Sequence, residues 1–326
     1  MHPALSVIFL TTLIGVGQGL FLALFTAHSY WLFGLLPGQD GQRFYALGSL
    51  MVLAFTGAGL FASFFHLGRP SRAWRSAAQW RTSWLSREVI VLPAFMGAVA
   101  LYGLAQWFDW NPVLLTLPSG LSLDTTVLLG TLAWLLSFVL FVCTGMIYAC
   151  LRFLRQWHTP LTVFNYVLTG GASGFTLAAA FAVYTAPDLV GFFAGWSLII
   201  TLLGLLNRLA SLRRNARLKA RSTLQTAIGI KHPHIRQTAM GFMSDSFNTR
   251  EFFHGGSRSQ LRAVQGFFLL AAFAAPLLLL ALGMKGASAG LLITAFVVQY
   301  CGLLAERWFF FADASHPQNL YYGSSA

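Results

Sequence analysis

The chain has 326 residues, of which 56% are hydrophobic and only 9% are charged, whereas about a quarter of the residues in a soluble domain are charged. This composition excludes a water-soluble globular enzyme. The 21 Lys and Arg residues outnumber the 9 Asp and Glu residues and leave a net charge of +12. In so apolar a chain this excess indicates cytoplasmic loops and not nucleic-acid binding.

Eight stretches are apolar and long enough to cross a bilayer as helices, which takes about 20 residues each. They cover residues 4–27, 45–66, 88–107, 126–150, 164–185, 189–207, 263–283 and 287–306. The first is interpreted as a retained membrane helix, because the N-terminus lacks the basic region of a signal peptide. The sequence therefore predicts an all-α, polytopic membrane protein with eight transmembrane helices, forming a single integral membrane domain over residues 1–326.

Basic residues are concentrated in alternate loops. The loops that follow the second, fourth, sixth and eighth spans contain 19 Lys and Arg residues, against Arg43 and Lys285 in the others. By the positive-inside rule, the rich loops and both termini face the cytoplasm. The expected location is thus the cytoplasmic (inner) membrane.

Ionisable side chains fall only in connecting loops or at helix ends in this scheme. Ion and proton pathways normally need ionisable groups within the membrane, which argues against a proton-coupled transporter or pump. Cys143, Cys150 and Cys301 lie in apolar runs without a CxxC pair, and His232 and His234 have too few neighbouring ligands. We therefore expect neither a cysteine-ligated cluster nor a metal site in this chain.

His66 ends the second span and Glu88 opens the third, so antiparallel helices would place both at the same cytoplasmic depth. A quinone headgroup has two carbonyls that accept hydrogen bonds and become hydroxyls on reduction. Its site therefore needs proton-exchanging groups at the apolar boundary, and histidine and glutamate suit that role. The alternative is structural: His66 would complement a helix C-terminus, and Glu88 would pair with Arg87 or Arg69.

Gln18 lies in the middle of the first span, among glycines. Its amide could form a hydrogen bond between helices, which is the commoner role, or reach a ligand. Haem b would need two histidines on different helices. His66 and His158 are the nearest pair, but His158 falls in a loop, so haem b is not expected.

The connection 208–262 is predicted to be a long, basic cytoplasmic loop. Its first part is basic and amphipathic, a pattern suited to anionic lipid or to a partner protein. Its later part mixes aromatic with charged residues, which favours ordered contact with another subunit over a solvated linker. The residues predicted to dock a partner are Arg213, Arg217, Phe247, Arg250 and Phe252.

Four short motifs occur in order along the spans. They are SFFHLGRP at 63–70 leading to WLSRE at 84–88, MIY at 146–148 with WHTP at 157–160, SFNTREF at 246–252, and ERWFFF at 306–311. With these motifs the chain resembles the membrane anchor subunits of the dimethyl sulfoxide reductase family, and within that family the membrane subunits of cytoplasmic sulfite dehydrogenases. The resemblance covers nearly the whole chain.

This resemblance implies an anchor bound, through an iron–sulfur electron-transfer subunit, to a molybdopterin-containing catalytic subunit. It also implies electron exchange with the quinone pool, in which the residues matching His66 and Glu88 bind quinol. The complete set of expected quinone-binding residues is His66, Glu88, Gly68, Arg69 and Gln18.

The expected function is electron transfer between the iron–sulfur subunit and quinone during sulfite oxidation. The chain would contribute no molybdenum chemistry and no metal of its own to this sulfite:quinone oxidoreductase. Two alternatives are an anchor of a dimethyl sulfoxide reductase-type complex that oxidises quinol, and a non-redox membrane scaffold or transporter.

Overall fold

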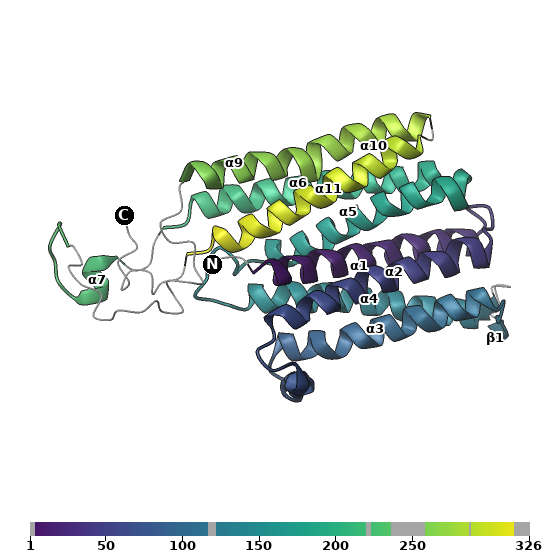
Figure 1. Ribbon diagram of the computed structural model, residues 1–326, viewed down its shortest axis with the longest axis horizontal. Coiled ribbons are helices and arrows are strands. Elements are labelled where there is room, and N and C mark those ends of the chain that lie inside the picture. Colours follow the sequence, from purple (N-terminus) through teal and green to yellow (C-terminus); the bar gives the residue numbers. More distant parts are fainter. Residues whose placement is uncertain (1–3, 117–121, 220–222, 236–257, 287, 316–326) are drawn as a thin grey trace.

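The computed structural model describes residues 4–116, 122–219, 223–235, 258–286 and 288–315. Within these ranges, eight helices are long and apolar enough to cross a membrane, and they run side by side (Figure 1). The predicted all-α, polytopic membrane fold is therefore confirmed. The expected docking residues Phe247, Arg250 and Phe252 lie outside the described residues.

The spanning helices alternate in direction along the chain. They are α1 (Leu5–Leu32), α2 (Leu47–Ser63), α3 (Trp84–Trp107), α4 (Thr125–Ala149), α5 (Pro160–Thr185), α6 (Val190–Ala216), α9 (Arg258–Leu269) continued by η5 (Leu270–Ala274) and α10 (Ala275–Lys285), and α11 (Ala289–Ala312). The end of the bundle where α1, α3, α5 and α9 begin carries the arginine-rich connections. We call it the basic end.

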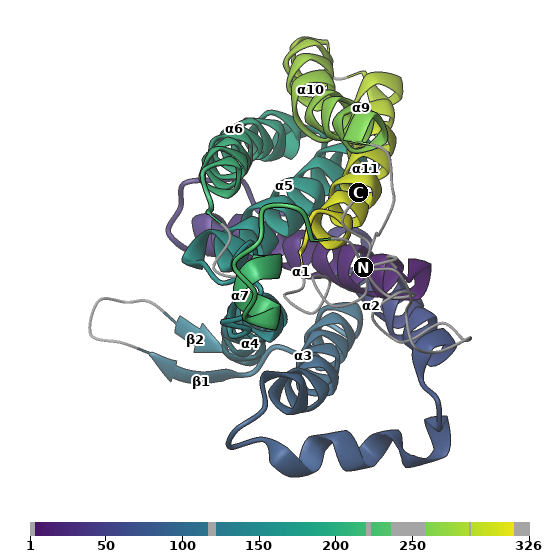
Figure 2. The same ribbon diagram turned by 90° about the vertical axis from the view of Figure 1, so that its left-hand side faces the viewer.

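Short elements connect these helices. They are η1 (Gly41–Ala46), η2 (Phe64–His66), η3 (Pro70–Gln79), η4 (Pro187–Leu189), α7 (Leu224–Ile228), and the antiparallel strands β1 (Val113–Thr116) and β2 (Ser122–Asp124). The η3 segment crosses the basic end from α2 to α3, apart from the other helices (Figure 2). The hairpin lies at the opposite end, where the Asp124 side chain caps α4 by accepting a hydrogen bond from the Val127 amide at 2.8 Å.

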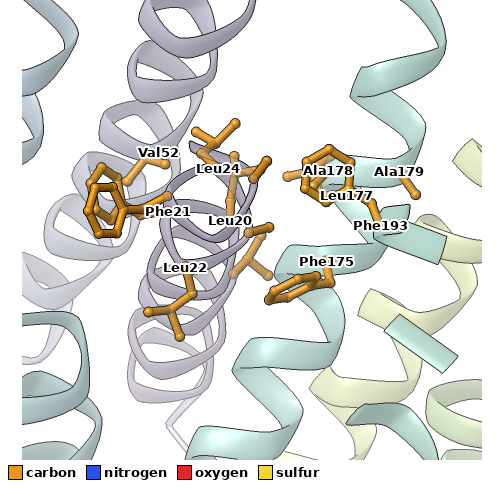
Figure 3. Packing of buried hydrophobic residues seen from close by; sticks show 14 of the residues in the cluster. Leu20, Phe21, Leu22, Leu24, Val52, Phe175, Leu177, Ala178, Ala179 and Phe193 are labelled. Atoms are coloured by element: carbon orange, nitrogen blue, oxygen red, sulfur yellow. The ribbon is translucent and has the colours of Figure 1, made fainter. Parts of the chain in front are cut away.

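The helices form two groups, α1 to α4 and α5 to α11, which meet where α1 packs against α5 (Figure 2). Glycines make this contact close: a Cβ atom on Gly174 would overlap the backbone of Gly19 and Leu20, and a Cβ on Gly19 would overlap the backbone of Gly170. Apolar α1 side chains fill the space on either side, between Val52 of α2 and the alanine-rich face of α5 (Figure 3).

Several helices are longer than expected, which corrects the prediction that ionisable groups stay in loops or at span ends. Helix α1 continues to Leu32, α6 to Ala216 and α11 to Ala312. As a result, His28, Arg208, Glu306 and Arg307 are buried within helices, each at most 4% exposed. The first part of the predicted 208–262 loop is likewise helical. Hydropathy ended these spans early because it scores each polar residue as if it faced lipid or water, whereas these side chains contact one another or other polar groups.

Candidate functional site

Glu88 lies one turn into α3, at the basic end of the bundle. The helix begins there because the Ser83 hydroxyl caps it, accepting a hydrogen bond from the Ser86 amide at 3.3 Å. The Glu88 carboxylate accepts a hydrogen bond from the Thr144 hydroxyl of α4. Among the described residues Glu88 forms no ion pair, so the predicted alternative, pairing with Arg87 or Arg69, is wrong.

A small polar cavity lies on the inner side of Glu88; we call it the inner cavity. Its volume is about 10 Å³, enough for roughly one water molecule and far too little for a quinone ring. Besides Glu88 and Thr144, it is lined by Thr11, Thr12, Ile14, Gly15, Gln18, Phe141, Tyr166, Thr169, Gly170, Ser173, Leu303 and Arg307. The structure thus brings Gln18 and Glu88 to the same cavity.

An open apolar groove runs between α3 and α4; we call it the α3–α4 groove. Its volume is about 340 Å³, within the range of small-molecule sites. It is lined by Trp84, Arg87, Val91, Phe138, Val139, Val142 and Cys143. Glu88 and Thr144 line the inner cavity, and the residues before them in the sequence, Arg87 and Cys143, line this groove.

The other three expected quinone-binding residues lie apart from Gln18 and Glu88. His66, Gly68 and Arg69 are exposed in the segment that leads from η2 into η3. The His66 ring makes no hydrogen bond, ion pair or ring contact within the described ranges, and it lines neither the inner cavity nor the α3–α4 groove. The expected pairing of His66 with Glu88 across the helix ends is therefore not formed by direct contact.

A buried ion cluster, which the sequence reasoning missed, borders the inner cavity. The Arg208 Nε atom of α6 lies 3.0 Å from Glu306 Oε1, and Arg307 Nη2 lies 3.6 Å from Glu306 Oε2. The Asn165 amide donates to Glu306 Oε1 at 3.0 Å, and the Arg307 guanidinium stands 3.8 Å from the centre of the Tyr166 ring. The apolar run from Trp308 to Ala312 could have indicated in the sequence that α11 continues one turn past these charges.

The C-terminal end of α6 carries both docking candidates that the structure describes, Arg213 in its last turn and Arg217 directly after it. Arg213 and Arg217 are exposed there. Arg214, which lies between them in the sequence, instead binds the connection between α4 and α5. It donates to the carbonyls of Arg155 at 3.0 Å and His158 at 3.2 Å. Arg213 and Arg217 are thus positioned on the surface by a helix end that is tied to the bundle.

Comparison with known proteins agrees with this architecture. The family model described as "DMSO reductase anchor subunit (DmsC)" matches residues 1–323. The chain is also 57% identical to a sulfite dehydrogenase subunit of Allochromatium vinosum over 326 residues, which cover 100% of both chains. The resemblance drawn from the four motifs is therefore confirmed. This multi-pass membrane protein belongs to the DMSO reductase anchor subunit (DmsC) family.

Proposed function

We propose that this anchor reacts with quinone and passes electrons to it from an iron–sulfur subunit, in a molybdopterin-containing complex that oxidises sulfite. Membership of the anchor family supports association with such a complex. The choice of sulfite rests on the name of the relative that is 57% identical over the full length. The partner subunits would hold the molybdopterin and the iron–sulfur clusters.

The position of Glu88 is the observation that carries the quinone assignment. Its carboxyl group lines the polar inner cavity, and the preceding residue, Arg87, lines the α3–α4 groove. The groove can hold an apolar ring between Trp84 and Phe138, with its tail in lipid, because the outward face of α4 is exposed and apolar. A quinone takes two electrons and two protons to become a quinol, and Glu88 is placed to donate a proton to a carbonyl oxygen.

His66, Gly68 and Arg69 would belong to the surface side of the same site. They are exposed at the basic end and line neither the inner cavity nor the α3–α4 groove. The predicted cytoplasmic arginines surround them, so an iron–sulfur subunit docked on this end would cover them. We therefore propose that the docked partner completes the site on the side of His66, while Glu88 acts from within the helices.

The test uses the intact complex purified in mild detergent, with sulfite as electron donor. Two acceptors are compared: decylubiquinone, which needs protons, and ferricyanide, which takes electrons alone. Glu88→Gln should lower quinone reduction at least about 100-fold, because a positioned proton donor is lost, while ferricyanide reduction stays at the wild-type rate. Asp188→Asn removes an exposed carboxylate at the opposite end and serves as the matched control.

Each rival function gives a different result in this assay. Full quinone reduction by both Glu88→Gln and His66→Ala would contradict the site. A complex that is not reduced by sulfite but oxidises quinol, with dimethyl sulfoxide as electron acceptor, would support the reductase alternative. Purification without iron or molybdenum would favour the non-redox scaffold or transporter.

A further inference from the structure

A second small cavity lies between the inner cavity and the basic end; we call it the outer cavity. Its volume is also about 10 Å³, and its lining includes Asn165, Arg208, Asn215 and Asp313. Asp313 follows the last residue of α11, so this cavity lies close to the end of the bundle. Burial is the largest influence on Asp313 and raises the pKa of its carboxyl, against the opposing effects of Arg208 and of a hydrogen bond with Asn215.

The ion cluster joins the two cavities. Arg208 lines the outer cavity and Arg307 lines the inner one, and both pair with Glu306. Neighbouring residues of α5 show the same division, because Asn165 lines the outer cavity and Tyr166 the inner one. The ion cluster thus forms the wall between the two cavities.

Polar atoms on both sides of this wall have no hydrogen-bond partner among the described residues. They are Nε and Nη1 of Arg307, Nη2 of Arg208, Oδ1 of Asn165 and Oε2 of Glu306. Leaving buried charged groups unsatisfied is costly. Internal water is the usual partner of such atoms, and each cavity has room for about one molecule.

The groove side of Glu88 offers no comparable polar path. The groove is lined by apolar side chains apart from Arg87 and the Cys143 thiol. Arg87 donates to the carbonyls of Trp80 at 2.9 Å and Arg81 at 2.7 Å, and an arginine keeps its proton at all ordinary pH values. A glutamate that gives its proton to a quinone in this groove must therefore be reprotonated from the interior.

We infer that internal water and polar side chains connect Asp313, through the outer cavity, the ion cluster and the inner cavity, to Glu88, and that protons reach Glu88 by this route. The inference rests on the proposed quinone reaction. Each quinone reduced takes two protons from the route, and its two electrons arrive from the partner subunit. Glu88 is left negative after each transfer and is neutralised by the next proton.

The charges of the ion cluster would also control when a proton passes from the outer cavity to the inner cavity. Arg208 and Arg307 remain protonated and outnumber Glu306, so an excess proton is repelled from the cluster until Glu88 becomes negative. Glu306 Oε1 already accepts a hydrogen bond from Asn165, whereas Glu306 Oε2 lacks a hydrogen-bond donor within the described ranges. Oε2 would exchange a proton with internal water when Glu88 becomes negative.

The experiment compares Asp313→Asn and Glu306→Gln in the sulfite-reducible complex, with decylubiquinone and ferricyanide as acceptors. Each variant should lower kcat for decylubiquinone at least about tenfold, leave its KM unchanged, and increase the solvent deuterium isotope effect. Ferricyanide reduction should not change. Asp313→Asn keeps every ion pair of the cluster, so it remains informative if Glu306→Gln does not assemble; Asp188→Asn is again the control.

Two results would overturn the route, and they are distinguishable from failure of the proposed function. Wild-type quinone rates in Asp313→Asn, with a wild-type isotope effect, would show that protons reach Glu88 in another way. A map of the wild-type complex at a resolution that reveals water, with both cavities empty, would also overturn it. If the proposed function itself is wrong, the wild-type complex will already fail to reduce decylubiquinone.

Discussion

The Gln18 side chain donates a hydrogen bond of 3.0 Å to the backbone carbonyl of Ser137, and the Ser137 hydroxyl donates to the Gln18 carbonyl at 3.4 Å. This reciprocal pair joins α1 to α4 at positions that are at most 2% exposed. Of the two roles expected for Gln18, hydrogen bonding between helices is thus observed. Gln18 also lines the inner cavity, which is too small for a quinone ring.

Replacing Gln18 should therefore affect stability more than quinone affinity. Gln18→Leu loses the hydrogen bond to Ser137, and bonds between membrane helices contribute about 1 kcal/mol. We expect a lower Tm of the detergent-solubilised chain and an unchanged KM for decylubiquinone. Gln79→Leu changes an exposed glutamine and should leave both quantities alone. A raised KM with an unchanged Tm would instead assign Gln18 to the quinone.

The α1–α5 contact should not tolerate even one added methyl group. Gly174→Ala would place a Cβ atom against the backbone of Gly19 and Leu20, and backbone atoms cannot move aside as a flexible side chain can. We expect the loss of folded, monodisperse protein in detergent chromatography. Gly97→Ala, in α3, meets no atom within 4 Å and should be neutral or stabilising by up to about 1 kcal/mol. Equal yields from the two variants would contradict the close packing.

Charge reversal at the end of α6 should weaken partner binding. Arg213 and Arg217 are exposed and basic, and opposite charges across an interface speed association and fix its orientation. Arg213→Glu with Arg217→Glu should lower the iron co-purified per chain at least about tenfold, more at low salt than at high salt. Arg43→Glu, at the opposite end of the bundle, is the control. Undiminished iron in the double variant would exclude this surface from docking.

Haem b should be absent from the purified chain. The other two histidines that could pair with His66 as haem ligands have different partners. His158 Nδ1 lies 2.6 Å from the Ala149 carbonyl oxygen. His28 Nδ1 lies 2.9 Å from the Tyr102 hydroxyl, at the opposite end of the bundle from His66. Since haem b takes axial ligands from facing helices, we expect no Soret band in the optical spectrum. A Soret band that disappears in His66→Ala would contradict this expectation.

Asp313 should make stability depend on pH. Burial raises its pKa in the folded state above the ordinary value of 3.8, so the folded protein binds more protons than the unfolded chain between those two values, and stability falls as pH rises through that window. Asp313→Asn should therefore have a higher Tm than wild type at about pH 7, and the two Tm values should become equal at about pH 4. Thermal unfolding at the two pH values measures this. A Tm difference between Asp313→Asn and wild type that grows on acidification would contradict this prediction.

Hydropathy was sufficient to locate the eight spanning helices within the described ranges, because about 20 consecutive apolar residues have few other stable arrangements. It placed the helix ends less well. Arg208 and Arg307 lie in helices that the sequence pattern ended at 207 and 306, since a window of residues cannot show that Arg208 of α6 pairs with Glu306 of α11, which also pairs with Arg307. Such pairing is a property of the packed structure.

Prediction of the site was uneven for a similar reason. Glu88 was found because a carboxylate at the start of an apolar span is conspicuous, and the anchor family was recognised from local motifs. The inner cavity, the α3–α4 groove and the contact between Glu88 and Thr144 depend on which helices are neighbours, which alternating spans do not specify. The arrangement in two groups of four helices likewise became visible only in the structure.

The glycine contact between α1 and α5 sets an order for biogenesis. Helix α1 is synthesised before the helices that it contacts: Ser137, the hydrogen-bond partner of Gln18, belongs to α4, and the glycines that face α1 belong to α5. The Gln18 amide therefore lacks its partner until α4 is inserted, and the glycine face of α1 stays uncovered until α5 is inserted. Ribosome-bound chains that end before Pro160 are thus the intermediates on which membrane proteases and insertion factors would act. The packing of the first four helices is complete only when α5 has been inserted.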